Sequence, residues 1–176
     1  AGDTYADIEN VLGSNFSDSI TGNALDNSLN GGNGIDFLSG LDGNDILNGN
    51  AGDDILDGGA GADMLLGGAG SNTASYGSAT SGVLADLIVA ANNTGDAAGD
   101  SYIAIQNLTG SAYDDELWGT QGVNTINGIG GDDLIFGRAG ADTLIGAAGD
   151  DVLECGADAD ALQCCSGSDT ASYSKS

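Results

Sequence analysis

The sequence predicts an all-β fold in which short strands and glycine-rich turns repeat every nine residues. From Gly31 the chain reads GGNGIDFLS, GLDGNDILN, GNAGDDILD and GGAGADMLL, so glycine, aspartate and leucine recur at fixed positions. The apolar share of 40% is high for a disordered acidic chain, although the net charge is −25. The acidic residues also keep their spacing, which a solvated run of charge has no reason to do.

Each nine-residue unit divides into a six-residue turn and a three-residue strand. Glycine opens the turn and returns in fourth place, aspartate fills the sixth place, and a large apolar residue fills the eighth. In the first four units these positions are Gly31, Gly40, Gly49 and Gly58; Gly34, Gly43, Gly52 and Gly61; Asp36, Asp45, Asp54 and Asp63; and Leu38, Leu47, Leu56 and Leu65.

Each position has a physical reason. The turn needs backbone shapes that a Cβ atom disfavours, hence glycine. The eighth side chain points between two sheets, whereas seventh and ninth side chains such as Phe37 and Asp57 point outward. Two units complete one coil of 18 residues. We therefore expect stacked coils that form two parallel sheets, with strands about 4.8 Å apart.

The nine-residue phase continues over nearly the whole chain outside residues 77–98. In the first copy it adds Asp18 and Asn27 at sixth positions. In the second copy the sixth positions are Asp115, Asn124, Asp133, Asp142, Asp151, Asp160 and Asp169.

A larger repeat lies over the short one. Residues 2–76 align with residues 99–173 at a constant offset of 97, without a gap. We therefore predict two modules, 1–76 and 99–173, joined by a connector at 77–98 with a strand-like stretch around Asp86. Residues 174–176 resemble the start of a further connector, and Tyr76 and Tyr173 are expected to cap the apolar core.

The pattern G-G-x-G-x-D-x-U-x, in which U is apolar, resembles the RTX (haemolysin-type) calcium-binding repeat family. The resemblance implies a parallel β-roll, a two-sheet solenoid with calcium in its turns. It places several Ca²⁺ ions between equivalent turns of successive coils, on both edges of the roll, with turn carbonyls and the sixth-position aspartate as ligands. Carboxylate and carbonyl oxygens are the donors that Ca²⁺ prefers.

The ligands implied in the first copy are Asp18, Gly31, Asn33, Gly34, Asp36, Gly40, Asp42, Gly43, Asp45, Gly49, Gly52, Asp54, Gly58, Gly61 and Asp63. In the second copy they are Asp115, Gly128, Gly131, Asp133, Gly137, Gly140, Asp142, Gly146, Gly149, Asp151, Asp160 and Asp169. Units two apart share an edge, so Asp36 should stack on Asp54 and Asp133 on Asp151. The core is thin, and we infer that the metal supplies most of the folding free energy.

Several positions depart from the pattern. Asn27, Asn72 and Asn124 replace aspartate, and we expect weak sites or end caps there. Asp158 replaces a turn glycine, which either adds a ligand or spoils the turn. Three cysteines, Cys155, Cys164 and Cys165, stand where the first copy has glycine. Their spacing does not suit a disulfide framework or a zinc site. Mutational drift, a sequence error and intermolecular bridging remain as explanations for cysteine at these positions.

The composition excludes several classes of function. With 2 basic residues against 27 acidic ones, neither nucleic acid nor an anionic membrane surface is a partner. There is no membrane-length apolar run. Histidine is absent, and the adjacent aspartates are accounted for by the repeat, so we expect no enzyme activity from the roll itself.

Two functions are compatible with the sequence, and both place the chain outside a bacterial cell, where the family is exported by type I secretion. In the first, it belongs to a structural or cell-surface protein that assembles with itself into an array or filament. In the second, it is a calcium-dependent folding and secretion module joined to a protease, lipase or polysaccharide-modifying enzyme. Ice binding would need a ladder of Thr and Asn on one face, which the third positions lack. Trp118, Phe136 and Phe37 fall at outward positions that suit a lateral contact or partial shielding by a neighbouring segment.

Overall fold

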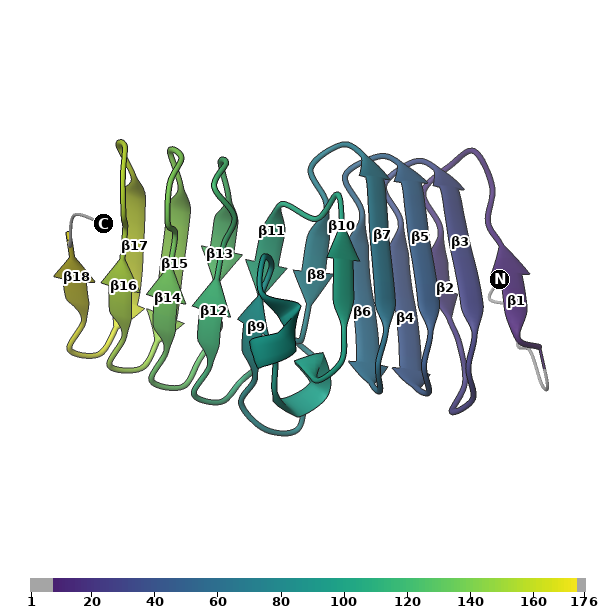
Figure 1. Cartoon of the computed structure of the whole chain (residues 1–176), viewed down its shortest axis with the longest axis horizontal. Helices are drawn as coiled ribbons and strands as arrows, with labels where there is room; N and C mark the ends of the chain where they lie inside the picture. Colours follow the sequence, from purple (N-terminus) through teal and green to yellow (C-terminus); the bar gives the residue numbers. More distant parts are fainter. Residues whose placement is uncertain (1–7, 174–176) are drawn as a thin grey trace.

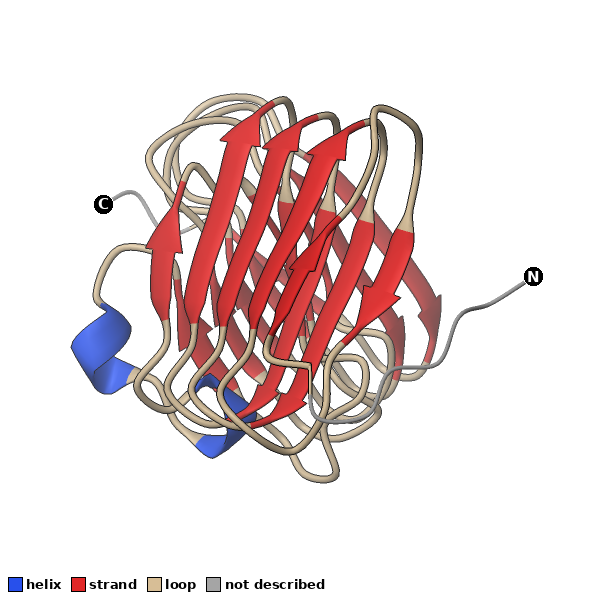
Figure 2. Cartoon of the chain, turned by 90° about the vertical axis from the view of Figure 1, so that its right-hand side faces the viewer, coloured by secondary structure: helices blue, strands red, loops and turns tan. Residues whose placement is uncertain are grey.

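The computed structural model of the chain describes residues 8–173, which form one parallel β-roll. Strands β1 and β18 lie at opposite ends of an elongated body, and the coils of each copy follow the order of the chain (Figure 1). Seen from the end, the strands form two layers, with the two short 3₁₀ helices outside them (Figure 2). Residues 1–7 of the first predicted module and residues 174–176, predicted as the start of a further connector, lie outside the described residues.

One layer is a single sheet, called here sheet B, that runs through both copies of the repeat. Its strands are β2 (Ser19–Thr21), β4 (Phe37–Asp42), β6 (Ile55–Ala60), β8 (Thr73–Ser75), β11 (Asn107–Thr109), β13 (Thr125–Asn127), β15 (Thr143–Ala148) and β17 (Ala161–Ser166). Strand β8 of the first copy pairs directly with β11 of the second. The two sequence copies therefore build one roll.

The other layer consists of two sheets. Sheet A contains β1 (Asn10–Leu12), β3 (Ser28–Asn33), β5 (Ile46–Ala51), β7 (Met64–Ala69) and β10 (Ser101–Ile103). Sheet C contains β9 (Leu84–Asp86), β12 (Glu116–Trp118), β14 (Leu134–Phe136), β16 (Val152–Glu154) and β18 (Thr170–Ser172). All these strands pair in parallel, and within each copy the partners are 18 residues apart, as in Phe37 with Ile55.

The connector joins these sheets in an unexpected order. After β8 the chain first forms β9, which pairs with β12, then turns through η1 (Ala90–Asn92) and η2 (Gly95–Ala97). It then returns to form β10 beside β7. The strand-like stretch around Asp86 is thus only three residues long. The connector also covers Asp57, whose carboxylate accepts a 2.9 Å hydrogen bond from Ser78, and this ninth-position side chain is buried although it was expected to face solvent.

The core is a column of eighth-position side chains between the layers. Its fully buried members are Leu29, Leu38, Leu47, Leu56, Leu65, Leu108, Leu117, Ile126, Ile135, Leu144 and Leu153. Where Ala74 is too small to continue the column, Tyr76 joins the same core and is 1% exposed. Tyr173 is 71% exposed, so its predicted capping role is wrong: no described residue folds over it as Tyr102 and Asp100 do over Tyr76.

Strand length also departs from prediction. Seven strands, among them β4 and β5, span six residues and continue into the following turn. The extension arises because the turns of successive coils pair as well, as in Asp42 with Ala60.

Candidate metal sites

The sixth-position residues form hydrogen-bonded ladders along the edges of the roll. At each step, one carboxylate oxygen, Oδ1, accepts a hydrogen bond from the backbone N–H of the sixth-position residue one coil earlier. Asp36 donates to Asp54 at 2.9 Å, and Asp133 donates to Asp151 at 3.0 Å. The stacking expected from the repeat is therefore present, and each carboxylate is held in place by the preceding coil.

There are three ladders, and each belongs to one sheet, because its residues stand directly before the strands of that sheet. Ladder A contains Asn27, Asp45, Asp63 and Asp100. Ladder B contains Asp18, Asp36, Asp54, Asn72 and Gln106, and then Asn124, Asp142 and Asp160. Ladder C contains Val83, Asp115, Asp133, Asp151 and Asp169.

The second carboxylate oxygen, Oδ2, distinguishes one group of aspartates from the rest. In seven of them it is buried and has no hydrogen-bond partner. They are Asp36, Asp45, Asp54, Asp63, Asp133, Asp142 and Asp151. Each of these residues is at most 1% exposed. A buried carboxylate oxygen without a partner is costly, which indicates that these atoms are placed to bind a cation.

The glycine that opens each unit is explained by the same carboxylate. A Cβ atom at Gly49 would lie 2.2 Å from Oδ2 of Asp54, and one at Gly128 would lie 1.9 Å from Oδ2 of Asp133. Such contacts do not occur between real atoms, so the aspartate and the glycine five residues before it are coupled. The same clash, at 2.1–2.5 Å, holds for the remaining predicted opening glycines, Gly31, Gly40, Gly58, Gly137 and Gly146.

The fourth-position glycines have a different reason. Gly52 has φ +149°, and a Cβ there would lie 1.6 Å from the carbonyl oxygen of Gly34, one coil earlier. Positive φ also holds at the other predicted fourth-position glycines, Gly34, Gly43, Gly61, Gly131, Gly140 and Gly149. Asp158 takes the same left-handed backbone, at φ 82°, without the freedom of glycine.

The backbone angle φ of the second residue in each nine-residue unit differs between two kinds of turn. In every turn that holds an unpaired Oδ2, this residue has positive φ, even where it is Leu41, Ile129 or Arg138 instead of glycine. We call these open turns. The seven second-position residues are Gly32, Leu41, Asn50, Gly59, Ile129, Arg138 and Ala147.

Four other turns close on themselves. In the turn of Asp115, the backbone N–H of Ser111 donates to Oδ2 at 2.5 Å, and the Ser111 hydroxyl accepts the N–H of Tyr113 at 3.1 Å. The same two bonds recur in the turns that begin at Gly13, Gly22 and Gly119, where the second position is Ser14, Asn23 or Thr120. These self-closed turns are the first two of each copy, and their sixth-position oxygens already have protein donors.

A comparison with known families assigns the chain. The model for the RTX calcium-binding nonapeptide repeat matches it in 4 copies, at residues 3–38, 39–74, 105–128 and 127–162. The chain belongs to the RTX calcium-binding repeat family. No curated protein matches it.

The donor set of the RTX open turns fits calcium. Among residues 8–173, no group of three or more His, Cys, Asp or Glu side chains comes together. A site there would combine the aspartate oxygens with backbone carbonyls, both of them hard oxygen donors, and this combination suits Ca²⁺ better than zinc or copper.

The electrostatics of the open turns point the same way. Burial raises the pKa of Asp63 and of Asp133 to about 7, and that of Asp142 to about 6. Burial likewise raises the pKa of Asp45, Asp54 and Asp151. Neighbouring carboxylates add to the effect in each case. A divalent cation would remove both the repulsion and the cost of the unpaired oxygen.

Several predicted RTX ligands do not supply a buried, unpaired carboxylate oxygen. The Oδ2 atoms of Asp18 and Asp115 are satisfied by Ser14 and Ser111. Asp160 and Asp169 are half-buried, and each accepts the ladder bond from the preceding coil. Asn33 and Asp42, both at third positions, are exposed. The Asn33 amide donates to Asn15 at 2.7 Å.

Two residues that accept ladder bonds were missed by sequence reasoning. Asp100 and Gln106 stand directly before β10 and β11, and they receive the backbone N–H bonds of Asp63 and Asn72. Asp100 lies outside the nine-residue phase of both copies. Gln106 lies nine residues before Asp115 and keeps the phase of the second copy, but it is not an aspartate, so a search for aspartate at the sixth position finds neither residue. The available signal for Asp100 was its place directly before the strand-forming Ser-Tyr-Ile. Its Oδ2 accepts a 2.8 Å bond from Tyr76, which closes ladder A with a protein donor.

The three cysteines stand at turn positions of the second copy. Cys155, Cys164 and Cys165 are all free thiols, the first buried and the other two exposed. Asp160, whose turn opens with Cys155, is also absent from the group of buried unpaired oxygens.

Proposed function

We propose that this chain is a calcium-binding segment of a secreted bacterial protein, which folds on calcium after export and serves a structural role at the cell surface or in a filament. The observation that carries the proposal is the set of seven buried Oδ2 atoms without partners. A roll that buries unpaired carboxylates in a chain of net charge −25 needs cations to be stable.

The export step follows from calcium availability. Extracellular calcium modules typically bind at about 10⁻⁴–10⁻³ M. A bacterial cytosol holds far less free calcium, so the chain stays unfolded there and can pass through a secretion channel. Outside the cell, calcium binding and folding occur together, because the sites are formed only in the folded roll.

The continuity of sheet B favours the structural role. Strand β8 pairs with β11 across the boundary between the copies, so each copy adds length to one rod. Further copies of the 97-residue repeat would extend the same sheet, which gives a direct route to a long array. The division into 1–76, 77–98 and 99–173 then describes repeats within one roll.

The second hypothesis, a folding and type I secretion module on an enzyme, would use the same calcium response. The sequence that flanks the segment in its parent protein distinguishes the two. A catalytic domain joined directly to this roll would overturn the structural role and leave calcium-driven folding intact.

A calcium titration followed by circular dichroism tests the proposal. We expect little strand signal in chelator, a cooperative rise centred near about 10⁻⁴–10⁻³ M Ca²⁺, and a much weaker response to Mg²⁺. Full strand signal in chelator at neutral pH would overturn it.

A further inference from the structure

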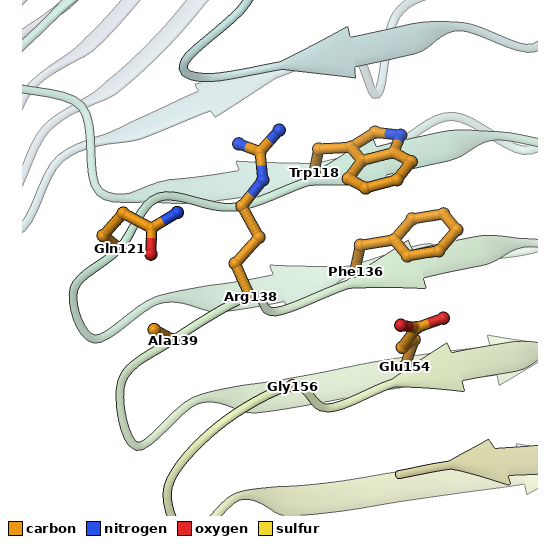
Figure 3. Close-up of a pocket in the computed structure, with 7 residues that line it drawn as sticks. All are labelled: Trp118, Gln121, Phe136, Arg138, Ala139, Glu154 and Gly156. Atoms are coloured by element: carbon orange, nitrogen blue, oxygen red, sulfur yellow. The ribbon is translucent and has the colours of Figure 1, made fainter. Parts of the chain in front are cut away.

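The outer face of sheet C carries a pair of aromatic side chains whose position the core does not explain. Trp118 and Phe136 occupy the ninth position of successive coils and pair in register. Their rings are stacked, with centroids 3.6 Å apart and planes 9° from parallel (Figure 3). No other ninth position between β2 and β18 holds an aromatic residue.

The rings are held in a fixed orientation. The indole N–H of Trp118 donates to the Glu116 carboxylate at 2.8 Å. The guanidinium of Arg138 lies 5.2 Å from the Trp118 ring centroid and binds both carboxylate oxygens of Asp86, at 2.9 and 2.7 Å. A ligand would therefore meet a preformed surface with little ordering cost.

Arg138 links the connector to the second copy. It comes from the second position of an open turn, with φ 75°, where the first copy has Leu41, 97 residues earlier, at φ 81°. Asp86 lies in the connector, 52 residues earlier. The ion pair fixes the connector over one side of Trp118, and the two charges neutralise each other.

A hollow of about 200 Å³ lies beside the rings. Its wall includes Trp118, Phe136 and Arg138, and Gln121, Ala139, Glu154 and Gly156 complete the lining (Figure 3). A second open hollow of about 480 Å³ on the connector side shares Trp118 and Arg138. Aromatic walls with a few amide and carboxylate groups at the rim are typical of small-molecule sites.

The chemistry of this lining selects a class of ligand. A sugar ring has a face of C–H groups that can pack against an aromatic wall. Its hydroxyls can donate hydrogen bonds to a carboxylate, and they can donate to or accept from an amide. An anionic polymer would be repelled by a chain of net charge −25. A cationic ligand would have to displace Arg138 from Trp118 and Asp86.

We propose that the hollow beside Trp118 and Phe136 binds one sugar ring of a neutral glycan. Trp118 and Phe136 supply the apolar wall, and Gln121 and Glu154 bond the hydroxyls. The site needs the calcium-loaded fold, but it is independent of how the chain is exported.

The single tryptophan of the chain gives a site-specific reporter. Fluorescence of the calcium-loaded full chain would be measured against cellobiose, maltose, xylobiose and N,N′-diacetylchitobiose. We expect a saturable change with at least one sugar. Phe136→Ala should weaken that binding by about tenfold, as expected for the loss of one aromatic contact, and Gln121→Ala should weaken it several-fold.

Phe37→Ala is the matched control, because Phe37 is an outward aromatic on sheet B, 40% exposed and remote in sequence from the hollow. It should leave sugar binding unchanged, and circular dichroism in calcium should show that all three variants remain folded. Three results would overturn the proposal: no saturable change with any of the four sugars; equal loss in Phe37→Ala; or binding only of an alginate oligomer or of N-acetylphenylalaninamide, which stand for an anionic polymer and a protein partner.

Discussion

The backbone N–H of Asp36 donates a 2.9 Å hydrogen bond to one carboxylate oxygen of Asp54, while the other oxygen of Asp54 is buried and has no partner. One atom of the side chain thus joins two coils, and the other is held ready for a ligand. Because Asp54 in turn donates to Asn72 at 3.0 Å, the arrangement passes along the edge of the roll. Coil stacking and cation binding are therefore functions of the same side chain.

Replacing Asp54 by Asn separates these two functions. Asn72 shows that an amide is accepted in ladder B and still receives the backbone bond. Asp54→Asn should therefore keep the stacking bond but remove the charge that the cation needs. We expect one fewer bound calcium by equilibrium dialysis and a calcium midpoint for folding raised on the order of tenfold.

The neighbouring Asp53 provides the matched control for that change. It carries the same charge but is exposed, and its Oδ1 accepts only the N–H of Ser71 at 2.8 Å. Asp53→Asn should leave the calcium count unchanged. Equal effects of the two substitutions would show that net charge, and not the unpaired oxygen, controls binding.

Two fourth-position glycines in successive coils should respond oppositely to alanine. Gly140 has φ +114°, and a Cβ there would lie 2.5 Å from the Gly122 carbonyl oxygen. Gly122 lies in a self-closed turn, where the nearest atom to a Cβ would be 3.7 Å away. In calcium, Gly140→Ala should lower the free energy of unfolding by about 1–3 kcal/mol, and Gly122→Ala should leave it unchanged or raise it by about 0.5 kcal/mol.

Denaturant titration of both variants at saturating calcium measures this difference. Equal destabilisation would contradict the distinction between open and self-closed turns.

The self-closed turns should support stability without binding calcium. The Ser111 hydroxyl accepts the N–H of Tyr113 and contacts Asp115 at 2.9 Å. Ser111→Ala should cost about 1 kcal/mol of unfolding free energy, the usual effect of losing a capping hydroxyl. The number of calcium ions counted by equilibrium dialysis should not change, and a loss of one ion would place a calcium in this turn.

Acid should stabilise the metal-free roll. Burial raises the pKa of Asp63 and Asp133 to about 7, whereas in an unfolded chain it is about 3.9. The folded chain then holds protons that the unfolded chain releases, so this stabilisation is complete below about pH 4 and is lost as the pH rises through about 7. In chelator, strand signal should grow as the pH falls from 8 to 5.

Protons and calcium compete for the same oxygens, so the calcium midpoint for folding should rise as the pH falls from 8 to 6. A metal-free strand signal that grows with increasing pH would contradict the burial of these carboxylates.

The repeat alone predicted most of the fold. Strict periodicity fixes the face of each residue, because Leu38 and Leu56 can be buried together only if their units stack 18 residues apart. The same 18-residue spacing correctly predicted that Asp36 stacks on Asp54. Such patterns are readable because each coil contacts only its neighbours.

The connector was beyond this reasoning because its contacts are not periodic. The return of the chain from β9 to β10 and the ladder role of Asp100 depend on pairings 32 to 37 residues apart, and the burial of Asp57 involves Ser78, 21 residues away. The self-closed turns were also missed, since they depend on backbone φ at the second position. Serine or threonine at that position was the available signal, whereas asparagine occurs there both in an open turn, as Asn50, and in a self-closed turn, as Asn23.

Hydrogen exchange of the ladder amides tests most directly the claim that calcium holds the roll together. The N–H groups of Asp36 and Asp54 bond to the next aspartate or asparagine in ladder B, so their exchange reports the stacked coils. In calcium at pH 7.5 they should be strongly protected, and in chelator they should exchange at the rate of an unfolded chain. Equal protection in calcium and in chelator would contradict the account.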